Sequence, residues 1–320
     1  MTVTQRPGVI DTITAGFGTV NKRLWLIIIP ILLDLMLWFG PKVFIAPLVD
    51  RALDGYHRLL VESSTQSSSQ DQLTLEQIEG VYLQTKEVVE PVGHLNLMGV
   101  LAWQLPSLLK TAMPESSASA GIESGLVFVL LLLGLGVASV LGVSIYLGAI
   151  AQFVRGDSFD LSFFLRRIGL NWARLLLFFV LLLFPLGLFV PAAILLLSVI
   201  GSWNAGLATL FGGLSLGVAL WLMLYLFFVK SAIFVGDVNP LWAIWHSFNL
   251  VRQNLWSVLG LFLLINVVTW GLAIAWGLIV GHPLGTVVAI AGNAYVVTGL
   301  AAATMIYYRD RYVLVQPRAA

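Results

Sequence analysis

Three polar side chains stand inside long apolar runs of this chain, where a polar group without a partner is costly. Asp34 lies ten residues beyond Leu24, which is about 15 Å along a helix and close to the middle of a bilayer. Asn266 and Asn293 lie at comparable depth in two other apolar runs. A carboxyl group at that depth is either protonated or paired with hydrogen-bond donors. Such a mid-membrane polar cluster is suited to moving a proton or a polar substrate, or to joining helices by hydrogen bonds.

Motifs for covalent or metal chemistry are missing. The sequence has no cysteine, so it offers no disulfide and no thiolate nucleophile. It also has no Walker loop, no His-Glu-x-x-His and no Gly-x-Ser-x-Gly. The net charge of +1 argues against a nucleic-acid partner. We therefore predict no catalytic residue, no cofactor and no metal site, and we expect that the protein is not an enzyme.

The composition is that of an integral membrane protein. The chain has 320 residues, of which 59% are hydrophobic and 10% are charged, whereas a soluble domain carries roughly 25% charged residues. A membrane-crossing helix needs roughly 20 apolar residues. The sequence therefore predicts an all-α membrane protein that forms a single domain over residues 1–320. The six predicted transmembrane helices are 24–48, 125–153, 173–200, 206–229, 255–280 and 284–307.

The distribution of charge predicts the orientation. Counting Arg174 just beyond the first connection, the two chain ends and the connections 154–172 and 230–254 carry 12 of the 17 Lys and Arg residues, while 49–124 holds ten of the sixteen acidic residues. Positively charged segments stay in the cytoplasm. We expect a multi-pass protein of the bacterial cytoplasmic (inner) membrane with both termini inside. Residues 49–124 then form an extracytoplasmic helical insert, with one helix from about 75 to Pro91 and a stretch at 94–109 that lies on the membrane or re-enters it.

A Phe and a Trp eight residues apart precede an apolar run three times in this chain. Apolar residues recur at helical spacing around each pair, in the stretches 10–24, 157–172 and 239–256. Each stretch, called a lead-in helix below, is predicted to lie on the cytoplasmic surface with its Trp as an interfacial anchor. The chain then consists of three units, each an interfacial helix plus a membrane hairpin. The three pairs are Phe17 with Trp25, Phe164 with Trp172, and Phe248 with Trp256.

Two readings of the lead-in helices stay open. They are either structural elbows that anchor the hairpins, or a joint collar that binds a partner or lipid headgroups. Gly236-Asp237 is interpreted as a turn and capping pair, and Asn239 as the side-chain N-cap of the third lead-in helix. Gly299 and Ala303, four residues apart, predict a close approach of two helix backbones.

The segment 235–260, VGDVNPLWAIWHSFNLVRQNLWSVLG, resembles a bacterial membrane family. The shared pattern is the step Ser247-Phe248, a basic residue at Arg252, and the Asn254-x-Trp256 entry to the next span. The family is the membrane domain attached to some glycerophosphodiester phosphodiesterases, together with its stand-alone relatives. The resemblance implies a six-span all-α fold. It does not carry over the phosphodiesterase activity, because this chain has no room for a catalytic barrel.

Together these features favour a non-enzymatic scaffold or accessory subunit. The expected partners are membrane lipids and other membrane proteins. The alternative is a small transporter or lipid-handling protein that uses Asp34, Asn266 and Asn293.

Overall fold

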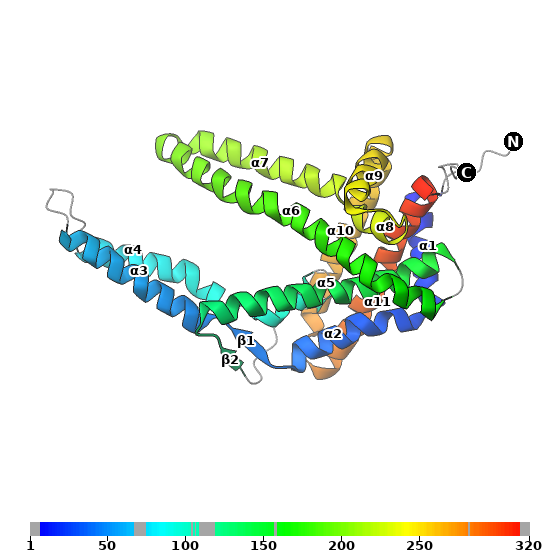
Figure 1. Ribbon diagram of the computed structural model, residues 1–320, viewed down its shortest axis with the longest axis horizontal. Coiled ribbons are helices and arrows are strands. Elements are labelled where there is room, and N and C mark those ends of the chain that lie inside the picture. The colour runs from blue at the N-terminus through cyan, green and yellow to red at the C-terminus, as the bar shows by residue number, and fades with distance from the viewer. Residues whose placement is uncertain are drawn as a thin grey trace. The chain divides into compact units, whose positions relative to one another are not determined.

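The computed structural model describes residues 7–66, 75–103, 105, 107–108, 119–156, 159–280 and 282–313. This part of the chain is mainly helical (Figure 1). Contacts divide the chain into unit 1, Met1–Ile31 with Val140–Ala320, and unit 2, Leu32–Ser139. The helices α2 (Ile28–Phe39) and α5 (Gly125–Arg155) each contribute residues to both units.

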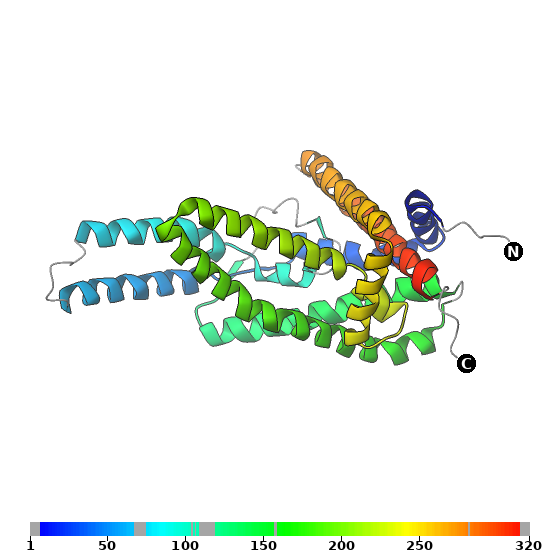
Figure 2. The ribbon, with the colours of Figure 1, turned by 90° about the horizontal axis from the view of Figure 1, so that it is seen from above.

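Unit 1 holds most of the long apolar helices. Its interior centres on α8, where Val229, Ala232 and Ile233 are fully buried, and on the second half of α11. Two ribbon views show α6 and α7 side by side as a hairpin (Figures 1 and 2). The elements are α1 (Val9–Asn21), η1 (Leu24–Ile27), the second part of α5 (Gly125–Arg155), α6 (Leu161–Trp203), α7 (Ala205–Tyr225), α8 (Val229–Phe234), α9 (Pro240–Gln253), α10 (Leu255–Ile279), α11 (Pro283–Tyr308) and η4 (Arg309–Val313).

Unit 2 contains the predicted insert. Its helices α3 and α4 pack as a hairpin in which Ile78 is buried and the Tyr82 ring lies 4.7 Å from that of His57, centroid to centroid. The predicted helix before Pro91 is present, but it continues through that proline to Gly93. The elements are α2 (Ile28–Phe39), β1 (Lys42–Phe44), α3 (Ala46–Gln66), α4 (Leu75–Gly93), η2 (Leu97–Ala102), β2 (Ser119–Gly121) and the first part of α5.

One feature of unit 2 departs from the all-α prediction. The strands β1 and β2 form a parallel pair that aligns Lys42 with Ser119 and Phe44 with Gly121. Each strand has three residues, too few to show the alternation by which a strand is recognised in a sequence. In the described part of the stretch 94–109, the side chain of Asn96 caps the short 3₁₀-helix η2, and Leu97 and Leu108 are buried in the protein.

Five helices in the described residues are long and apolar enough to cross a membrane: Gly125–Arg155, Leu161–Trp203, Ala205–Phe234, Leu255–Ile279 and Pro283–Tyr312. They match the second to sixth predicted spans. The first predicted span, 24–48, is shorter than expected, because its apolar helical stretch is Leu24–Phe39 and β1 follows at Lys42. Asn204 alone separates α6 from α7, as the C-cap of the first helix and the N-cap of the second.

The second lead-in helix is not a separate element. The predicted break at Trp172 is absent, and α6 runs without interruption over 43 residues, a length of about 64 Å. The other two lead-in helices end at Asn21 and Gln253, and in both the residue two before the Trp has left the helical conformation: φ is −145° at Arg23 and −131° at Asn254. The middle copy has Leu170 at that position, a strong helix former that supports continuation. This helix is about twice as long as the hydrocarbon core is thick, roughly 30 Å.

Candidate functional site

Asp34 lies on α2 and is fully buried. Its Oδ1 accepts a hydrogen bond from the Ser107 hydroxyl at 2.5 Å, and the Leu108 N–H donates to its two oxygens at 3.2 and 3.0 Å. Non-helical backbone is tolerated at membrane depth only where its polar groups find partners in the protein. The carboxylate therefore supplies the acceptors for a non-helical turn of the insert, within unit 2. This arrangement is that of a structural anchor.

The two predicted amide partners of Asp34 belong to unit 1. Asn266 is half-buried on α10, and its Nδ2 donates to the Phe262 carbonyl of the same helix at 2.7 Å. Asn293 is half-buried on α11. Since Asn266 satisfies a donor within its own helix, it does not need a second helix for that bond. A joint cluster of the three residues stays a prediction.

The three predicted anchors differ in their surroundings. Trp256 is 82% exposed at the start of α10. Trp25 is 40% exposed, and its ring meets the edges of Phe153 and Phe159 at centroid distances of 5.8 and 5.3 Å. Trp172 is half-buried inside the continuous α6. Only the first and third anchors therefore stand at a break between two helices.

The first and third lead-in helices, α1 and α9, bury the same three positions. Counted from the Phe of each copy, the buried positions lie five residues before it, one residue before it and three residues after it. They are four residues apart and therefore form one stripe along the helix. Small side chains on such a stripe let helix backbones approach closely. In α9 the central hydroxyl donates to the Tyr225 carbonyl at 2.5 Å and accepts from the Phe228 N–H at 3.1 Å. The buried positions are Thr12, Gly16 and Val20 in α1 and Ala243, Ser247 and Val251 in α9.

The large apolar residues of these helices point the other way. Ile10 is 75% exposed on α1, and Leu241, Trp242 and Trp245 are 67%, 59% and 54% exposed on α9. The predicted apolar stripes thus gave much of the outward face, although Val20 and Val251, which were counted with them, pack inward. An exposed apolar face on a short helix beside the ends of long apolar helices is suited to lipid or to another membrane protein.

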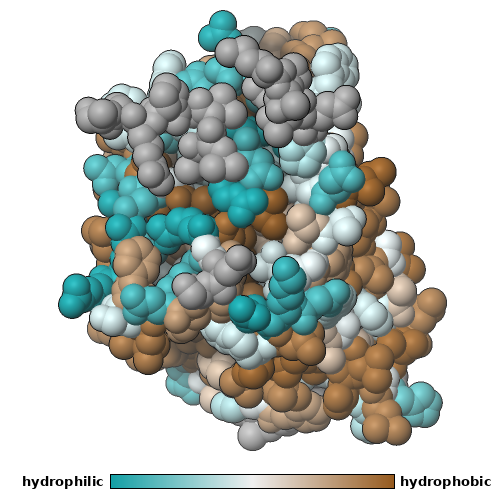
Figure 3. All heavy atoms as spheres, turned by 90° about the vertical axis from the view of Figure 1, so that its right-hand side faces the viewer, coloured by the Kyte–Doolittle hydropathy of each residue, from teal (hydrophilic) through white to brown (hydrophobic). Residues whose placement is uncertain are grey.

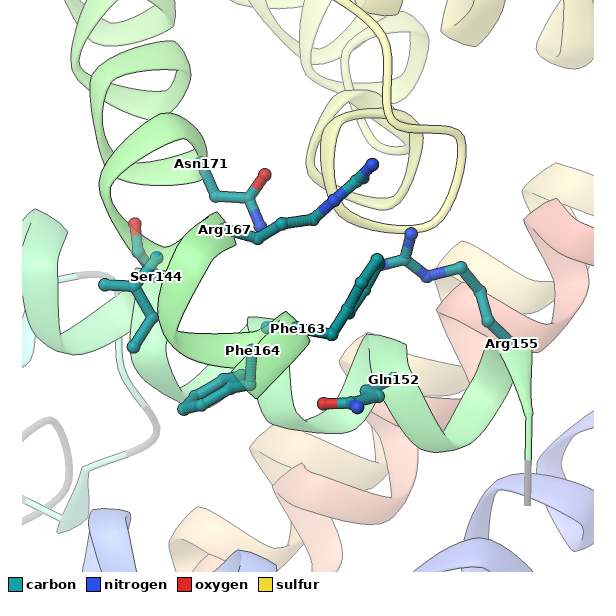
Figure 4. Close-up of a pocket in the computed structure, with 9 residues that line it drawn as sticks. Ser144, Gln152, Arg155, Phe163, Phe164, Arg167 and Asn171 are labelled. Atoms are coloured by element: carbon teal, nitrogen blue, oxygen red, sulfur yellow. The ribbon is translucent and has the colours of Figure 1, made fainter. Parts of the chain in front are cut away.

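The middle copy has large residues at the three positions, namely Phe159, Phe163 and Arg167. None of them is buried. Instead of a tight helix contact, the start of α6 and the end of α5 leave a small hollow that is partly open to solvent and encloses room for about one water molecule. Figure 4 shows the hollow between the two helices. It is lined by Ser144, Gly148, Gln152 and Arg155 of α5 and by Phe163, Phe164, Arg167, Ile168 and Asn171 of α6.

An ion-pair cluster borders this hollow. Asp237 accepts from Arg167 at 2.5 Å and from Arg174 at 2.6 Å. Partial burial alone would raise the pKa of Asp237, but the hydrogen bonds from the two arginines outweigh it, and the pKa of this carboxyl lies below its ordinary value. Asp237 has φ 56°, a left-handed conformation that Asp tolerates better than most residues.

The turn predicted at Gly236-Asp237 is confirmed, but its capping role is wrong. Asp237 holds arginines of α6, and the N-cap of α9 is Asn239, whose side chain makes no capping hydrogen bond. The Asn239 carbonyl accepts the first intrahelical hydrogen bond of α9, from the Ala243 N–H at 2.8 Å. A Cβ at Gly236 would lie 2.7 Å from the Tyr308 hydroxyl, so the turn needs glycine there. The similar pair Gly156-Asp157 lies partly outside the described residues.

Sequence reasoning did not single out Gln152, Asn171 or the pairing of Arg174 with Asp237. A signal was present, because Arg174 stands two residues after the predicted anchor Trp172, at the entrance to an apolar run. A charged residue in that position needs a partner.

Figure 3, which looks onto the right-hand side of Figure 1, shows hydrophilic side chains gathered on this face with hydrophobic ones around them. Within the described residues, no three His, Asp or Glu side chains gather as metal ligands.

A comparison with protein-family models finds no match, and searches of the curated proteins and of the solved structures find none either.

Proposed function

We propose that this chain is a non-enzymatic scaffold or accessory subunit of the bacterial cytoplasmic membrane, which contacts lipids and other membrane proteins through α1, α9 and the start of α6. The observation that supports it is the division of faces on the lead-in helices. Small residues such as Gly16 and Ser247 fix these helices to the protein, while Trp242 and Trp245 stay exposed. The buried carboxylate of Asp34 accepts hydrogen bonds from Ser107 and Leu108 and in this way joins α2 to the insert.

The proposal includes six spans in three units, with both termini in the cytoplasm. Five long helices and the shorter stretch Leu24–Phe39 make up the six. The shared buried positions of α1 and α9 support the repeat, and the distribution of basic residues supports the orientation. The resemblance to the membrane domain of some glycerophosphodiester phosphodiesterases also stands as a proposal, limited to the fold.

The orientation can be tested with single cysteines, because the natural chain has none. Glu87 and Gln253 are both exposed and lie on opposite sides of the proposed membrane. In intact spheroplasts, a membrane-impermeant maleimide is expected to label Glu87→Cys, and to label Gln253→Cys only after the membrane is permeabilised. The reverse pattern contradicts the proposed orientation, and labelling of both in intact spheroplasts contradicts the six spans.

The scaffold role can be tested with the exposed tryptophans of α9. The double variant Trp242→Ser, Trp245→Ser is expected to fold as the wild type does and to lose protein or lipid that copurifies in a mild detergent. The matched control is Trp203→Ser, since Trp203 is 87% exposed at the far end of α6. Wild-type protein that purifies with no stoichiometric partner and no retained lipid argues against the scaffold.

The alternative proposal is a transporter or lipid-handling protein that uses Asp34, Asn266 and Asn293. It predicts that Asp34→Asn abolishes uptake or lipid flipping while expression is unchanged. A protein with Asp34→Leu that is as stable and as functional as the wild type excludes this alternative.

A further inference from the structure

The hollow between α5 and α6 contains two buried oxygen atoms without a partner in the described structure. Asn171 is 4% exposed and Gln152 is 8% exposed, and neither Asn171 Oδ1 nor Gln152 Oε1 accepts a hydrogen bond. The Gln152 Nε2 is held in place, because it donates to the Asp160 carbonyl at 3.0 Å. Buried amide oxygens without donors are uncommon, and each carries a desolvation penalty. The two side chains therefore line a place where a hydroxyl group or water can donate.

Two arginines stand at the same hollow. The guanidinium carbons of Arg155 and Arg167 lie 5.6 and 4.7 Å from the centroid of the Phe163 ring (Figure 4). Arg167 also pairs with Asp237, but within the described residues Arg155 has no carboxylate at ion-pair distance. Arg167 repels the like charge of Arg155, and this repulsion is larger than the attraction of Arg155 to Asp237. An anion between them would relieve this repulsion and accept several N–H donors at once.

We propose that this hollow binds the phosphate group of an anionic, hydroxyl-bearing headgroup, with Arg155 and Arg167 on the phosphate oxygens and with Gln152 and Asn171 accepting from the hydroxyl groups. The occupant is a phospholipid of the phosphatidylglycerol type. This inference rests on the proposed function, because it places the hollow at the cytoplasmic surface of the membrane, where basic pockets between helices meet anionic headgroups. The choline group of phosphatidylcholine has no hydroxyl to donate and carries a positive charge, which the arginines repel.

The test is a binding titration of the purified, delipidated full-length protein in a mild detergent. The probes are dioctanoyl-phosphatidylglycerol, dioctanoyl-phosphatidylcholine and inorganic phosphate, and the readouts are intrinsic tryptophan fluorescence and bound lipid in native mass spectrometry. Arg155→Gln is expected to raise the Kd for the anionic lipid about tenfold, which corresponds to the loss of one strong charged contact. Arg155→Lys is expected to restore part of the affinity, because it keeps the charge.

Two further variants separate a built site from general attraction of charges. Arg166→Gln removes the same charge from the neighbour of Arg167, which is exposed and outside the hollow; it is expected to change the Kd less than roughly threefold. Asn171→Leu fills the hollow without changing the charge and is expected to weaken binding about as much as Arg155→Gln. Equal effects of Arg155→Gln and Arg166→Gln, or full binding by Asn171→Leu, would overturn the proposal.

The probes also identify the source of the phosphate. Binding of phosphatidylglycerol that depends on Arg155 supports a lipid occupant, whereas such binding of inorganic phosphate alone supports a site for a free phosphate. Binding of neither, or equal binding of phosphatidylcholine, refutes the site. The copurifying partners of Arg155→Gln report separately on the scaffold: if they are retained while lipid binding is lost, the two roles are distinct.

Discussion

The backbones of α1 and α11 touch at Gly16 and Gly299. A Cβ on Gly16 would fall 2.5 Å from the Gly299 carbonyl oxygen, and a Cβ on Gly299 would fall 2.6 Å from the Phe17 ring. The contact extends along both helices, because the Tyr295 hydroxyl donates to Asn21 Oδ1 at 2.7 Å. The first lead-in helix is therefore packed lengthwise against a long apolar helix. Its predicted position at the cytoplasmic surface of the membrane stays a prediction.

A methyl group at Gly16 should separate these two helices. We expect Gly16→Ala to lower the free energy of unfolding by about 1–3 kcal/mol, since an overpacked contact must open. Gly18 lies on the same helix with nothing within 4 Å of its ideal Cβ position, so Gly18→Ala should be neutral or slightly stabilising. Thermal unfolding in a mild detergent, followed by circular dichroism, compares the two. Equal midpoints for both variants would show that α1 is not packed in this way.

The sequence predicted this contact from one side only. The small residues Gly299 and Ala303 predicted that another helix approaches α11 closely. They did not identify α1 as that helix, because the most obvious pattern in the sequence of α1 is its apolar face. That pattern marks exposed residues such as Ile10, whereas the packed stripe of Thr12, Gly16 and Val20 is recognised only once its counterpart in α9 is seen to be buried as well. The hydropathy pattern of a helix shows which of its faces avoids water. In a membrane protein, the face that contacts lipid and the face that contacts protein both avoid water, so hydropathy does not distinguish them.

The same limit applies to polar residues. Asp34 stood out as a buried carboxylate, yet its partners, Ser107 and the Leu108 N–H, lie more than 70 residues further along the chain. The pairing of Asp237 with Arg167 and Arg174 also joins residues that are far apart in the chain, at least 63 residues. The spacing of residues along one helix predicts which side chains are neighbours on that helix. It does not predict which distant segment of the chain supplies a hydrogen-bond donor.

Replacing Asp34 should destabilise the protein in proportion to the acceptors that are lost. Asp34→Leu leaves the Leu108 N–H buried without an acceptor, and we expect a loss of about 1–3 kcal/mol in the free energy of unfolding. Asp34→Asn keeps one acceptor oxygen and should lose less. Asn266→Leu serves as the control, because Asn266 bonds only to the Phe262 carbonyl of its own helix in the described contacts. The measurement is unfolding in mixed micelles of increasing denaturing-detergent fraction. A wild-type midpoint for Asp34→Leu would refute the anchoring role.

The cluster of Asp237 with Arg167 and Arg174 should make the protein sensitive to strong acid. The pKa of Asp237 is below its ordinary value of 3.8 in the folded chain, so the unfolded chain takes up this proton first as the pH falls. The stabilisation is therefore complete above about pH 4 and is lost as the pH falls through the folded pKa. Asp237→Asn, which keeps the left-handed turn, should remove this step from a plot of unfolding midpoint against pH.

The control for Asp237 is another ion pair. Arg51 and Glu123 also form a salt bridge, but their side chains are 61% and 66% exposed, and exposed pairs contribute little. Glu123→Gln should therefore leave the acid step in place. An acid step that survives in Asp237→Asn would mean that another carboxyl group causes it.

His246 should produce a second, separate pH effect at milder acidity. Its Nδ1 lies 3.2 Å from the Tyr308 hydroxyl, and its ring packs on Tyr312 at a centroid distance of 4.3 Å. Burial disfavours the charged imidazolium, so the pKa of His246 in the folded chain lies below its ordinary value of 6.5. Below about pH 6.5 the unfolded chain binds the proton first, and stability falls with pH until the folded pKa is reached. Above that window the residue is neutral in both states and stability no longer depends on it.

His246→Gln should flatten the unfolding midpoint between about pH 6.5 and pH 5, where Asp237 is still fully ionised. Because the His246 effect begins below about pH 6.5 and the Asp237 effect begins only below about pH 4, a single pH series on the wild type, Asp237→Asn and His246→Gln assigns each step to its residue. A slope that persists in His246→Gln would mean that another group causes it, and would show that protonation of the α9–α11 contact does not limit stability.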